Sequence, residues 1–159
     1  MHPEPQDEIR VASFRDLDAI TLYAILRLRG DVFVVEQECA YADIDGRDTE
    51  PGTRHVWLAR DRDVLAYLRL LADDGVERIG RVVVAPAERG AGHAGALMRH
   101  ALTVIGNRDC VLDAQSHLVE FYRRLGFEVT GPEFIEDGIG HLPMRRAAGA
   151  LTPKRPPAR

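Results

Sequence analysis

From Arg81 to Met98 the chain reads RVVVAPAERGAGHAGALM. The run of valines favours an extended strand, the three glycines permit a tight turn, and the apolar spacing that starts at Ala94 predicts an amphipathic helix. At the start of a helix several backbone N–H groups are unpaired, and the helix dipole places partial positive charge there. The segment therefore predicts a strand, a turn and a helix around a site for an anion such as a phosphate group.

The same glycines are compatible with a second ligand. Gly90, Gly92 and Gly95 spell GxGxxG, the fingerprint of dinucleotide-binding folds. In that fold the first glycine follows the strand end closely and a second strand-helix-strand half is needed, whereas here residues 85–89 intervene and one crossover is available. A dinucleotide-dependent oxidoreductase stays open as an alternative. A P-loop NTPase is excluded because no Gly-Lys-Ser/Thr follows the turn.

The N-terminal part of the chain predicts helices. A short strand at residues 9–13 precedes an amphipathic helix that Gly30 is expected to end, and residues 31–37 are expected to form a second, shorter helix. The apolar face of the first helix is formed by Leu17, Ile20, Ala24 and Leu28.

From residue 54 onward the sequence predicts strands, first as an antiparallel group and then in alternation with helices. Alternating apolar residues separated by polar turns predict three antiparallel strands, and the last third alternates helix and strand. The predicted strands lie at residues 54–60, 64–71, 76–85, 110–114, 127–130 and 139–145. The order contains one strand-helix-strand crossover, so the expected fold class is α+β (mixed α/β). We expect a mostly antiparallel mixed sheet of six to seven strands with about four helices.

Composition predicts one domain. The chain has 159 residues, 45% hydrophobic and 29% charged, and we expect a domain over residues 7–146 with flexible ends at 1–6 and 147–159. A net charge of −4 supplies no general basic field for nucleic acid. No apolar run reaches the length of a membrane span and no secretory signal is present, so a cytoplasmic location is expected. Cys39 and Cys110 lack CxxC spacing, which predicts neither a metal site nor a disulfide framework.

The glycine turn resembles an acetyl-CoA motif. Arg89-x-x-Gly92-x-Ala94 is similar to the Arg/Gln-x-x-Gly-x-Gly/Ala sequence at the start of the central helix in the GCN5-related N-acetyltransferase (GNAT) family. The predicted order of elements also matches, and the resemblance covers residues 9–146. Further segments are similar to the ElaA-like group of that family: residues 22–29, 32–37, 43–46, 80–82, 114–117, 121–122, 126–127 and 136–139, with His141.

The resemblance implies how acetyl-CoA, the acyl-donor cosubstrate, is bound. The family fold splays its sheet at this site, and pantetheine is expected to lie along Val82, Val83 and Val84 as if it were another strand. The pyrophosphate is expected to meet backbone N–H groups of the turn, which comprises Arg89, Gly90, Ala91, Gly92, His93, Ala94 and Gly95. Gln115, at the end of the next strand, is expected to border the same site.

The resemblance also implies catalytic residues. Tyr122 occupies the general-acid position of the family, and its phenol can also serve as a core aromatic. His117 is a candidate general base because an imidazole with a pKa of about 6.5 can take a proton at neutral pH. Glu36 is a candidate base or acceptor-binding residue.

Acidic residues and two further histidines lead to separate expectations. Glu36, Asp43 and Asp45 are expected to form an acidic rim that attracts a cationic amine. His55 and His141 are each expected to be structural or supporting residues.

The activity that the resemblance implies is acetyl transfer from acetyl-CoA to a primary amine, on a small molecule or a protein. The transfer would proceed by direct attack in a ternary complex. A non-catalytic acyl-CoA-binding domain stays open as an alternative function, and a homodimer as an assembly.

Overall fold

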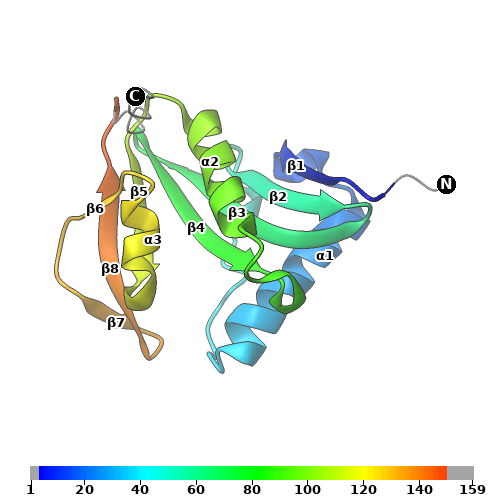
Figure 1. Ribbon diagram of the computed structural model, residues 1–159, viewed down its shortest axis with the longest axis horizontal. Helices are drawn as coiled ribbons and strands as arrows, with labels where there is room; N and C mark the ends of the chain where they lie inside the picture. The colour runs from blue at the N-terminus through cyan, green and yellow to red at the C-terminus, as the bar shows by residue number, and fades with distance from the viewer. Residues whose placement is uncertain (1–3, 150–159) are drawn as a thin grey trace, which may run out of the picture.

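An eight-stranded mixed sheet runs through the computed structural model, which describes residues 4–149 (Figure 1). The strands are β1 (Asp7–Ala12), β2 (Arg54–Arg60), β3 (Asp63–Asp73), β4 (Val76–Val84), β5 (Cys110–Gln115), β6 (Glu128–Val129), β7 (Phe134–Glu136) and β8 (Ile139–Arg146). Their order is β1-β2-β3-β4-β5-β8-β6, and β7 also pairs with β8. The predicted fold class is confirmed. The strand beyond the expected six or seven is β7, whose three residues are too few to show an alternating pattern in the sequence.

Within the described residues, β4 and β5 are the one parallel pair, and all other neighbours are antiparallel. A dinucleotide-binding fold needs a doubly wound parallel sheet. The oxidoreductase alternative is therefore wrong.

Three α-helices cover the sheet, α1 (Ala19–Arg29), α2 (His93–Ile105) and α3 (Val119–Arg123). Asp18 caps α1, since its carboxylate accepts a hydrogen bond from the Thr21 N–H (2.7 Å). The expected break at Gly30 is wrong: Gly30 keeps helical backbone angles, and α1 continues directly into the π-helix η2 (Gly30–Glu36). Short 3-10 turns complete the set: η1 (Phe14–Asp16), η3 (Arg47–Thr49), η4 (Pro86–Glu88) and η5 (Ser116–Leu118).

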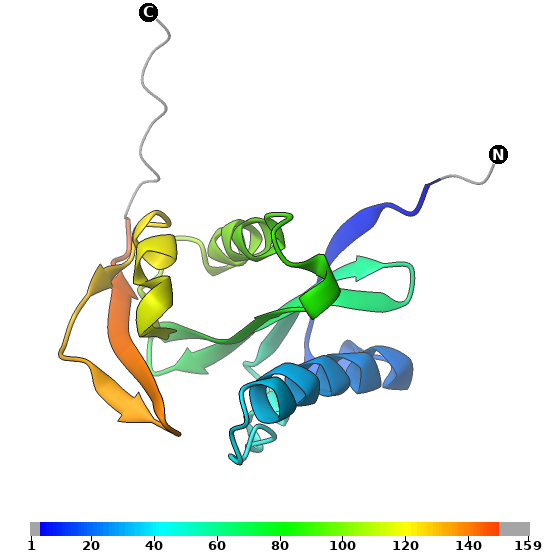
Figure 2. The same cartoon turned by 60° about the horizontal axis from the view of Figure 1, so that its bottom comes forward.

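Two apolar cores lie on opposite faces of the sheet, with α1 on one side and α2 on the other (Figure 2). The larger core joins α2 and α3 to the sheet, and the smaller joins α1 and η2 to it. We call these the α2/α3 face and the α1 face. The predicted apolar face of α1 is partly wrong, because Ile20 is 55% exposed whereas Ile25, Leu28 and Arg29 are buried.

The sheet opens between β4 and β5. The two strands pair only at Glu77 with Cys110 and at Arg78 with Val111 and then diverge. Beyond these pairs the register between β3 and β4 shifts, and Arg81 has a φ of +55°, which marks a bulge in β4. The bulge leaves one edge of β4 without a neighbouring strand in the described part of the chain, as the gap in Figure 2 shows.

The two chain ends are only partly described. Residues 147–149 follow β8 as a turn in which the Ala148 N–H donates a hydrogen bond to the Asp109 carboxylate (2.6 Å). The expected flexible segments include residues 1–3 and 150–159, which lie outside the described residues. Among residues 4–149, no helix has the length and apolar character needed to cross a membrane.

Candidate active site

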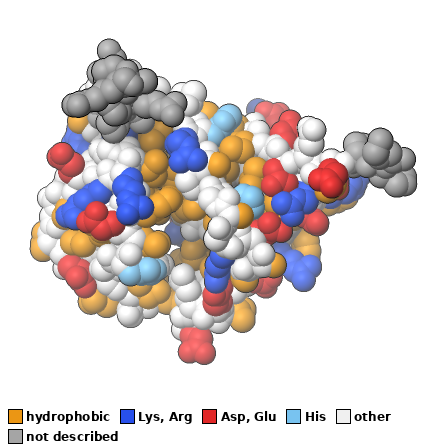
Figure 3. All heavy atoms as spheres, in the orientation of Figure 1, with side chains coloured by type: hydrophobic (Ala, Val, Ile, Leu, Met, Phe, Trp, Pro, Cys, Tyr) orange, Lys and Arg blue, Asp and Glu red, His pale blue; other side chains and the backbone are white. Residues whose placement is uncertain are grey.

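A cleft of about 1380 Å³ follows the gap between β4 and β5. We call η2, residues 37–45 and the free edge of β4 the N-terminal wall, and β5, η5, α3 and the β7–β8 hairpin the C-terminal wall. Figure 3 views the face that α2 and α3 cover and shows a hollow near its centre. The cleft brings together most of the predicted site residues: Glu36, Val82, Val83, Val84, Arg89, Ala94, Gln115, His117 and Tyr122.

The two ends of the glycine turn, Arg89 and Ala94, line one end of the cleft. The other predicted turn residues do not line it: Gly90, Ala91, Gly92, His93 and Gly95. Gly90 and Gly92 have φ values of +85° and +80°, which side chains rarely adopt, and Gly92 is the N-cap residue of α2. The first helical hydrogen bond is donated by the Ala96 N–H to the Gly92 carbonyl (3.1 Å), so the three preceding N–H groups have no helical acceptor. A Cβ added at either glycine would contact nothing within 4 Å. The turn is thus an open, positively polarised surface that fits a phosphate group.

The free edge of β4 continues from this turn. Val83 and Val84 pair with Tyr67 and Ala66 on the β3 side, while the opposite edge faces the cleft. An unpaired strand edge presents N–H and C=O groups that can bond an extended amide-containing chain. The edge and the turn together fit the two ends of a pantetheine-pyrophosphate group.

Arg89 and Glu36 close one side of the cleft with a bidentate ion pair. The two guanidinium nitrogens lie 2.6 and 2.7 Å from the two carboxylate oxygens, and both side chains are exposed. The hydrogen bond from Arg89 holds the pKa of Glu36 below its ordinary value. Glu36 is therefore a weak base, and the charge of Arg89 is directed at Glu36.

The expected acidic rim is a neutralised network instead. Each of its loop carboxylates is bonded to arginines: Asp43 to Arg29 (3.1 Å) and Arg81 (2.9 Å), and Asp45 to Arg69 (2.8 Å). The prediction that Asp43 and Asp45 present free negative charge is wrong. Hydrogen bonding by Arg69 holds the pKa of Asp45 well below its usual range, so the carboxylate stays ionised and paired.

The centre of this network is buried. Arg29 has no exposed surface, and its guanidinium lies 2.7 Å from Asp48, which also pairs with Arg69 (3.1 Å). His55 bridges the Asp48 carbonyl (3.0 Å) and the Tyr67 hydroxyl (2.7 Å), and burial lowers its pKa, which confirms a structural role. The sequence reasoning missed Arg29, Asp48 and Arg69. These residues are 19 to 40 positions apart, and no local pattern links them.

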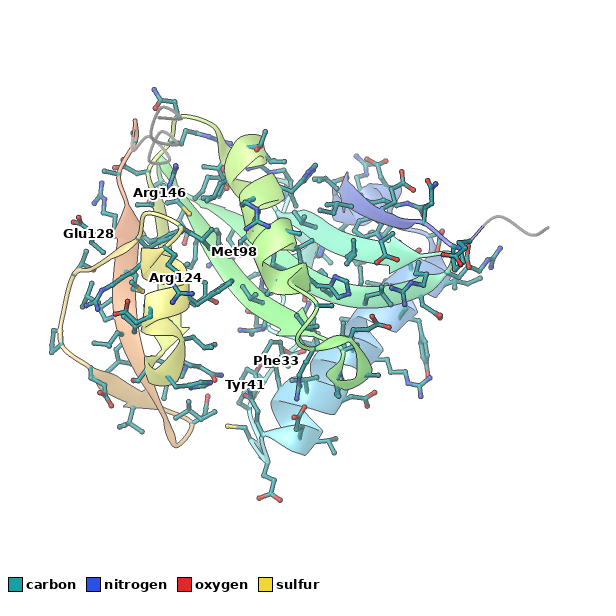
Figure 4. All side chains as sticks on the ribbon, viewed as in Figure 1. Phe33, Tyr41, Met98, Arg124, Glu128 and Arg146 are labelled. Atoms are coloured by element: carbon teal, nitrogen blue, oxygen red, sulfur yellow. The ribbon has the colours of Figure 1, made fainter. Side chains whose placement is uncertain are left out.

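An aromatic pair covers the N-terminal wall. Phe33 and Tyr41 lie near each other below β4 in Figure 4, and both line the cleft. The Tyr41 hydroxyl donates to Asp43 (2.8 Å), and the Arg81 guanidinium lies 5.3 Å from the Tyr41 ring centre. These contacts fix the position of Arg81 at the bulge of β4.

Tyr122 projects from α3 into the cleft. Its ring makes edge contacts with Phe121 (5.0 Å between centroids) and Phe127 (6.2 Å) and is 6% exposed. Burial raises the pKa of the phenol to about 12, so the hydroxyl is protonated at neutral pH. This hydroxyl lacks a hydrogen-bond partner within residues 4–149, and it is available as a donor in the cleft.

The remaining predicted residues differ in exposure. Gln115 ends β5 and is half-buried, whereas His117 lies in η5 and is exposed. His93 is half-buried at the start of α2, where its ring lies 3.3 Å from the Glu88 carboxylate. Over the described chain, no three His, Cys, Asp or Glu side chains are grouped so that they could hold a metal ion.

Comparison with known proteins gives consistent results. A family model described as an acetyltransferase (GNAT) domain matches residues 27–148. A UPF0039 protein of Mycobacterium tuberculosis is 45% identical over 137 residues, which cover 83% of this chain and 88% of that protein. Protein ElaA of Escherichia coli is 41% identical over 138 residues, covering 82% of this chain and 90% of ElaA.

Solved structures share the architecture. The crystal structure of an acyl-CoA N-acyltransferase from Pseudomonas aeruginosa superposes with a TM-score of 0.86 at 41% identity, covering 89% of this chain and all of that one. The crystal structure of Escherichia coli ElaA gives a TM-score of 0.84 at 36% identity in the structural alignment, covering 89% of this chain and 99% of that one. The similarity extends over both walls of the cleft.

Proposed function

The chain belongs to the GNAT acetyltransferase family, within its ElaA-like group, and on that premise we propose that it transfers an acetyl group from acetyl-CoA to a primary amine. One observation carries the proposal: the ends of the glycine turn at Arg89 and Ala94, the free edge of β4 and the unpaired Tyr122 hydroxyl all border a single cleft. We further propose that residues 7–146 form the catalytic domain.

Acetyl-CoA would lie on the glycine turn and on the edge of β4 that has no neighbouring strand within residues 4–149. Its amides would pair with the edge at Val82, Val83 and Val84, and its pyrophosphate would accept hydrogen bonds from N–H groups at the start of α2. Gln115 would border the thioester end from the opposite wall. Arg89 would contribute mainly by holding Glu36 across the cleft, since both of its terminal nitrogens are already bonded.

The proposed reaction is a direct acyl transfer. The acceptor arrives as an ammonium ion and loses one proton before its nitrogen attacks the thioester carbon. The C–N bond then forms and the C–S bond breaks. The nitrogen loses a second proton as the amide forms, the thiolate gains one, and one proton is released overall.

Tyr122 would assist departure of the thiol. A phenol that is protonated at neutral pH can donate a hydrogen bond to the developing thiolate and deliver a proton that the amide nitrogen replaces. Because a thiol has an ordinary pKa of about 8.5, the thiolate is a fair leaving group and the contribution of Tyr122 is moderate.

Thiol release across a panel of amines tests this proposal. Acetyl-CoA is mixed with the full chain and with small alkylamines, amino sugars and lysine peptides, and free thiol is measured. We expect amine-dependent release for at least one class. Binding of acetyl-CoA by calorimetry without release for any amine would instead support the non-catalytic binding domain.

A further inference from the structure

The two strands behind the cleft sort their side chains between the faces of the sheet. In β5 and β8, Leu112, Ala114 and Met144 belong to the core beneath α2 and α3. Side chains alternate along a strand, so Gln115 and His141 point to the opposite, α1 face. The register of the two strands places Gln115 directly opposite His141. Both residues line the cleft.

His141 is held in a defined orientation. Its Nδ1 lies 2.8 Å from the Ile139 carbonyl oxygen. A carbonyl only accepts hydrogen bonds, so Nδ1 carries the proton and the neutral ring keeps its lone pair on Nε2. The ring also stacks on Phe134, with 5.6 Å between centroids and 20° between planes, and these two residues are register partners of β7 and β8. The backbone and one aromatic ring thus fix both the tautomer and the position of the imidazole.

The other candidate bases are not held with a free lone pair in a fixed orientation. Glu36 is bound through both oxygens by Arg89, which makes it a poor proton acceptor. His117 is exposed and has no hydrogen-bond partner among residues 4–149, so nothing fixes its tautomer. The carboxylates of Glu136 and Asp137 are exposed and have no partner within residues 4–149. They lie at the hairpin turn beside His141 and can pass a proton on to water.

We propose that His141 is the general base, taking a proton from the acceptor ammonium on Nε2, an inference that rests on the proposed function. The N–H bond of the ammonium breaks, Nε2 gains the proton, and the nitrogen lone pair attacks the thioester carbon; the imidazolium later returns the proton to water. His141 acts from the α1 face and Tyr122 from the α2/α3 face. The amine therefore enters on one side of the sheet while the thiol leaves on the other.

The test varies the basicity of the amine. His141→Asn keeps a donor for the Ile139 carbonyl and removes Nε2, and His100→Asn, on α2 and outside the residues that line the cleft, is the matched control. The probes are ethylamine, an ammonium at neutral pH, and 2,2,2-trifluoroethylamine, whose nitrogen is largely unprotonated. We expect His141→Asn to lower kcat with ethylamine by roughly 100-fold or more and with trifluoroethylamine by less than about 10-fold. His100→Asn should change neither rate substantially.

Equal losses of rate with both amines would indicate a structural role and overturn the inference, as would unchanged rates with both. Absence of thiol release by the unaltered protein would instead remove the proposed function itself. The ring tautomer of His141, measured by ¹⁵N NMR on the free protein, gives a readout without turnover. A proton on Nδ1 supports the inference, and a proton on Nε2 overturns it.

Discussion

The two walls of the cleft are held in place by different forces. The N-terminal wall rests on a buried network in which Arg29 and Arg69 are 0% and 3% exposed and Asp48 is paired with both. The C-terminal wall joins β4 through two register pairs and the ion pair of Arg78 with Asp113 (3.5 Å), and Arg108, just before β5, pairs with buried Glu77 of β4 (2.6 Å). Buried charges cannot move apart without leaving one unpaired, so the N-terminal wall has a single favourable arrangement.

The two walls also differ in whether their polar side-chain groups are already bonded within the protein. Charged groups of the N-terminal wall are bonded to one another, whereas the Tyr122 hydroxyl and Nε2 of His141 in the C-terminal wall have no hydrogen-bond partner in the described chain. The Cys39 thiol of the N-terminal wall also donates a hydrogen bond to the Asp137 carbonyl of the C-terminal wall (2.9 Å). We infer that the N-terminal wall fixes the geometry of the site and that the C-terminal wall supplies proton transfer.

Breaking the buried network should have the largest effect on stability. Arg29→Met leaves Asp43 and Asp48 with less compensating charge, and we expect a loss of about 3–5 kcal/mol in the free energy of unfolding. Urea unfolding followed by circular dichroism measures this loss. The control is Arg27→Met, because the Arg27 pair with Asp31 is exposed at 3.7 Å and should contribute little. Equal stability of both variants would contradict the contrast between the walls.

A side chain at the glycine turn should remove cofactor binding without unfolding the protein. Gly92→Asp places a carboxylate where the pyrophosphate is proposed to bind, and we expect the Kd for CoA to rise at least about 100-fold, or about 2.8 kcal/mol. Calorimetry measures the affinity. Gly75→Asp is the matched control, because Gly75 has nearly the same φ (+81°) and open space in the β3–β4 turn. Retained affinity in Gly92→Asp, with an unchanged circular dichroism spectrum, would refute the assignment of the turn.

Removing the phenolic hydroxyl tests the C-terminal wall. Tyr122→Phe keeps the ring contacts with Phe121 and Phe127 and removes the donor, so kcat should fall by roughly 10- to 100-fold while KM for acetyl-CoA changes less. Steady-state kinetics separates the two parameters. Tyr23→Phe, at a position that is 71% exposed on α1, serves as the control. An unchanged kcat would remove Tyr122 from the mechanism.

Acid should weaken the N-terminal wall first. Hydrogen bonding by Arg69 lowers the pKa of Asp45. Burial raises the pKa of Asp48, but the hydrogen bonds and positive charges of Arg29 and Arg69 together outweigh burial, and the net shift is downward. A carboxylate with a lowered folded pKa stabilises the fold above its unfolded value of about 4, and this stabilisation is lost as the pH falls through the folded pKa. Unfolding free energies measured from pH 6 to pH 2 should therefore decrease, and Asp45→Asn should show a shallower decrease. Identical slopes would exclude this contribution.

The sequence predicts the architecture well where local signals are strong. The strands at residues 54–60 and 139–145 match β2 and β8 closely, because alternating side chains and polar turns fix such elements locally. The predicted helix end at Gly30 was wrong because glycine can also adopt helical backbone angles. The buried side chains of Val32 and Phe33 continue the packing of α1 through η2.

The site was predictable only in part, because some of its contacts join residues that are far apart in the sequence. The glycine turn and Tyr122 carry local signals, whereas the pairing of Asp43 and Asp45 depends on arginines from other elements. The net charge of −4 therefore does not describe the charge of the cleft. The orientation of His141 depends on the register of β8 with β7 and β5, which its sequence neighbours do not reveal.

The stoichiometry of thiol and acetylated amine tests the central claim most directly. Free CoA thiol and N-acetylated product are quantified in the same reaction, the product by mass spectrometry, with acetyl-CoA and the amine that supports the fastest release. Direct acyl transfer in this cleft predicts one acetylated amine for each thiol released. Gly92→Asp should yield neither product, because acetyl-CoA would not bind. Thiol release without acetylated amine, or neither product with any amine, would contradict it.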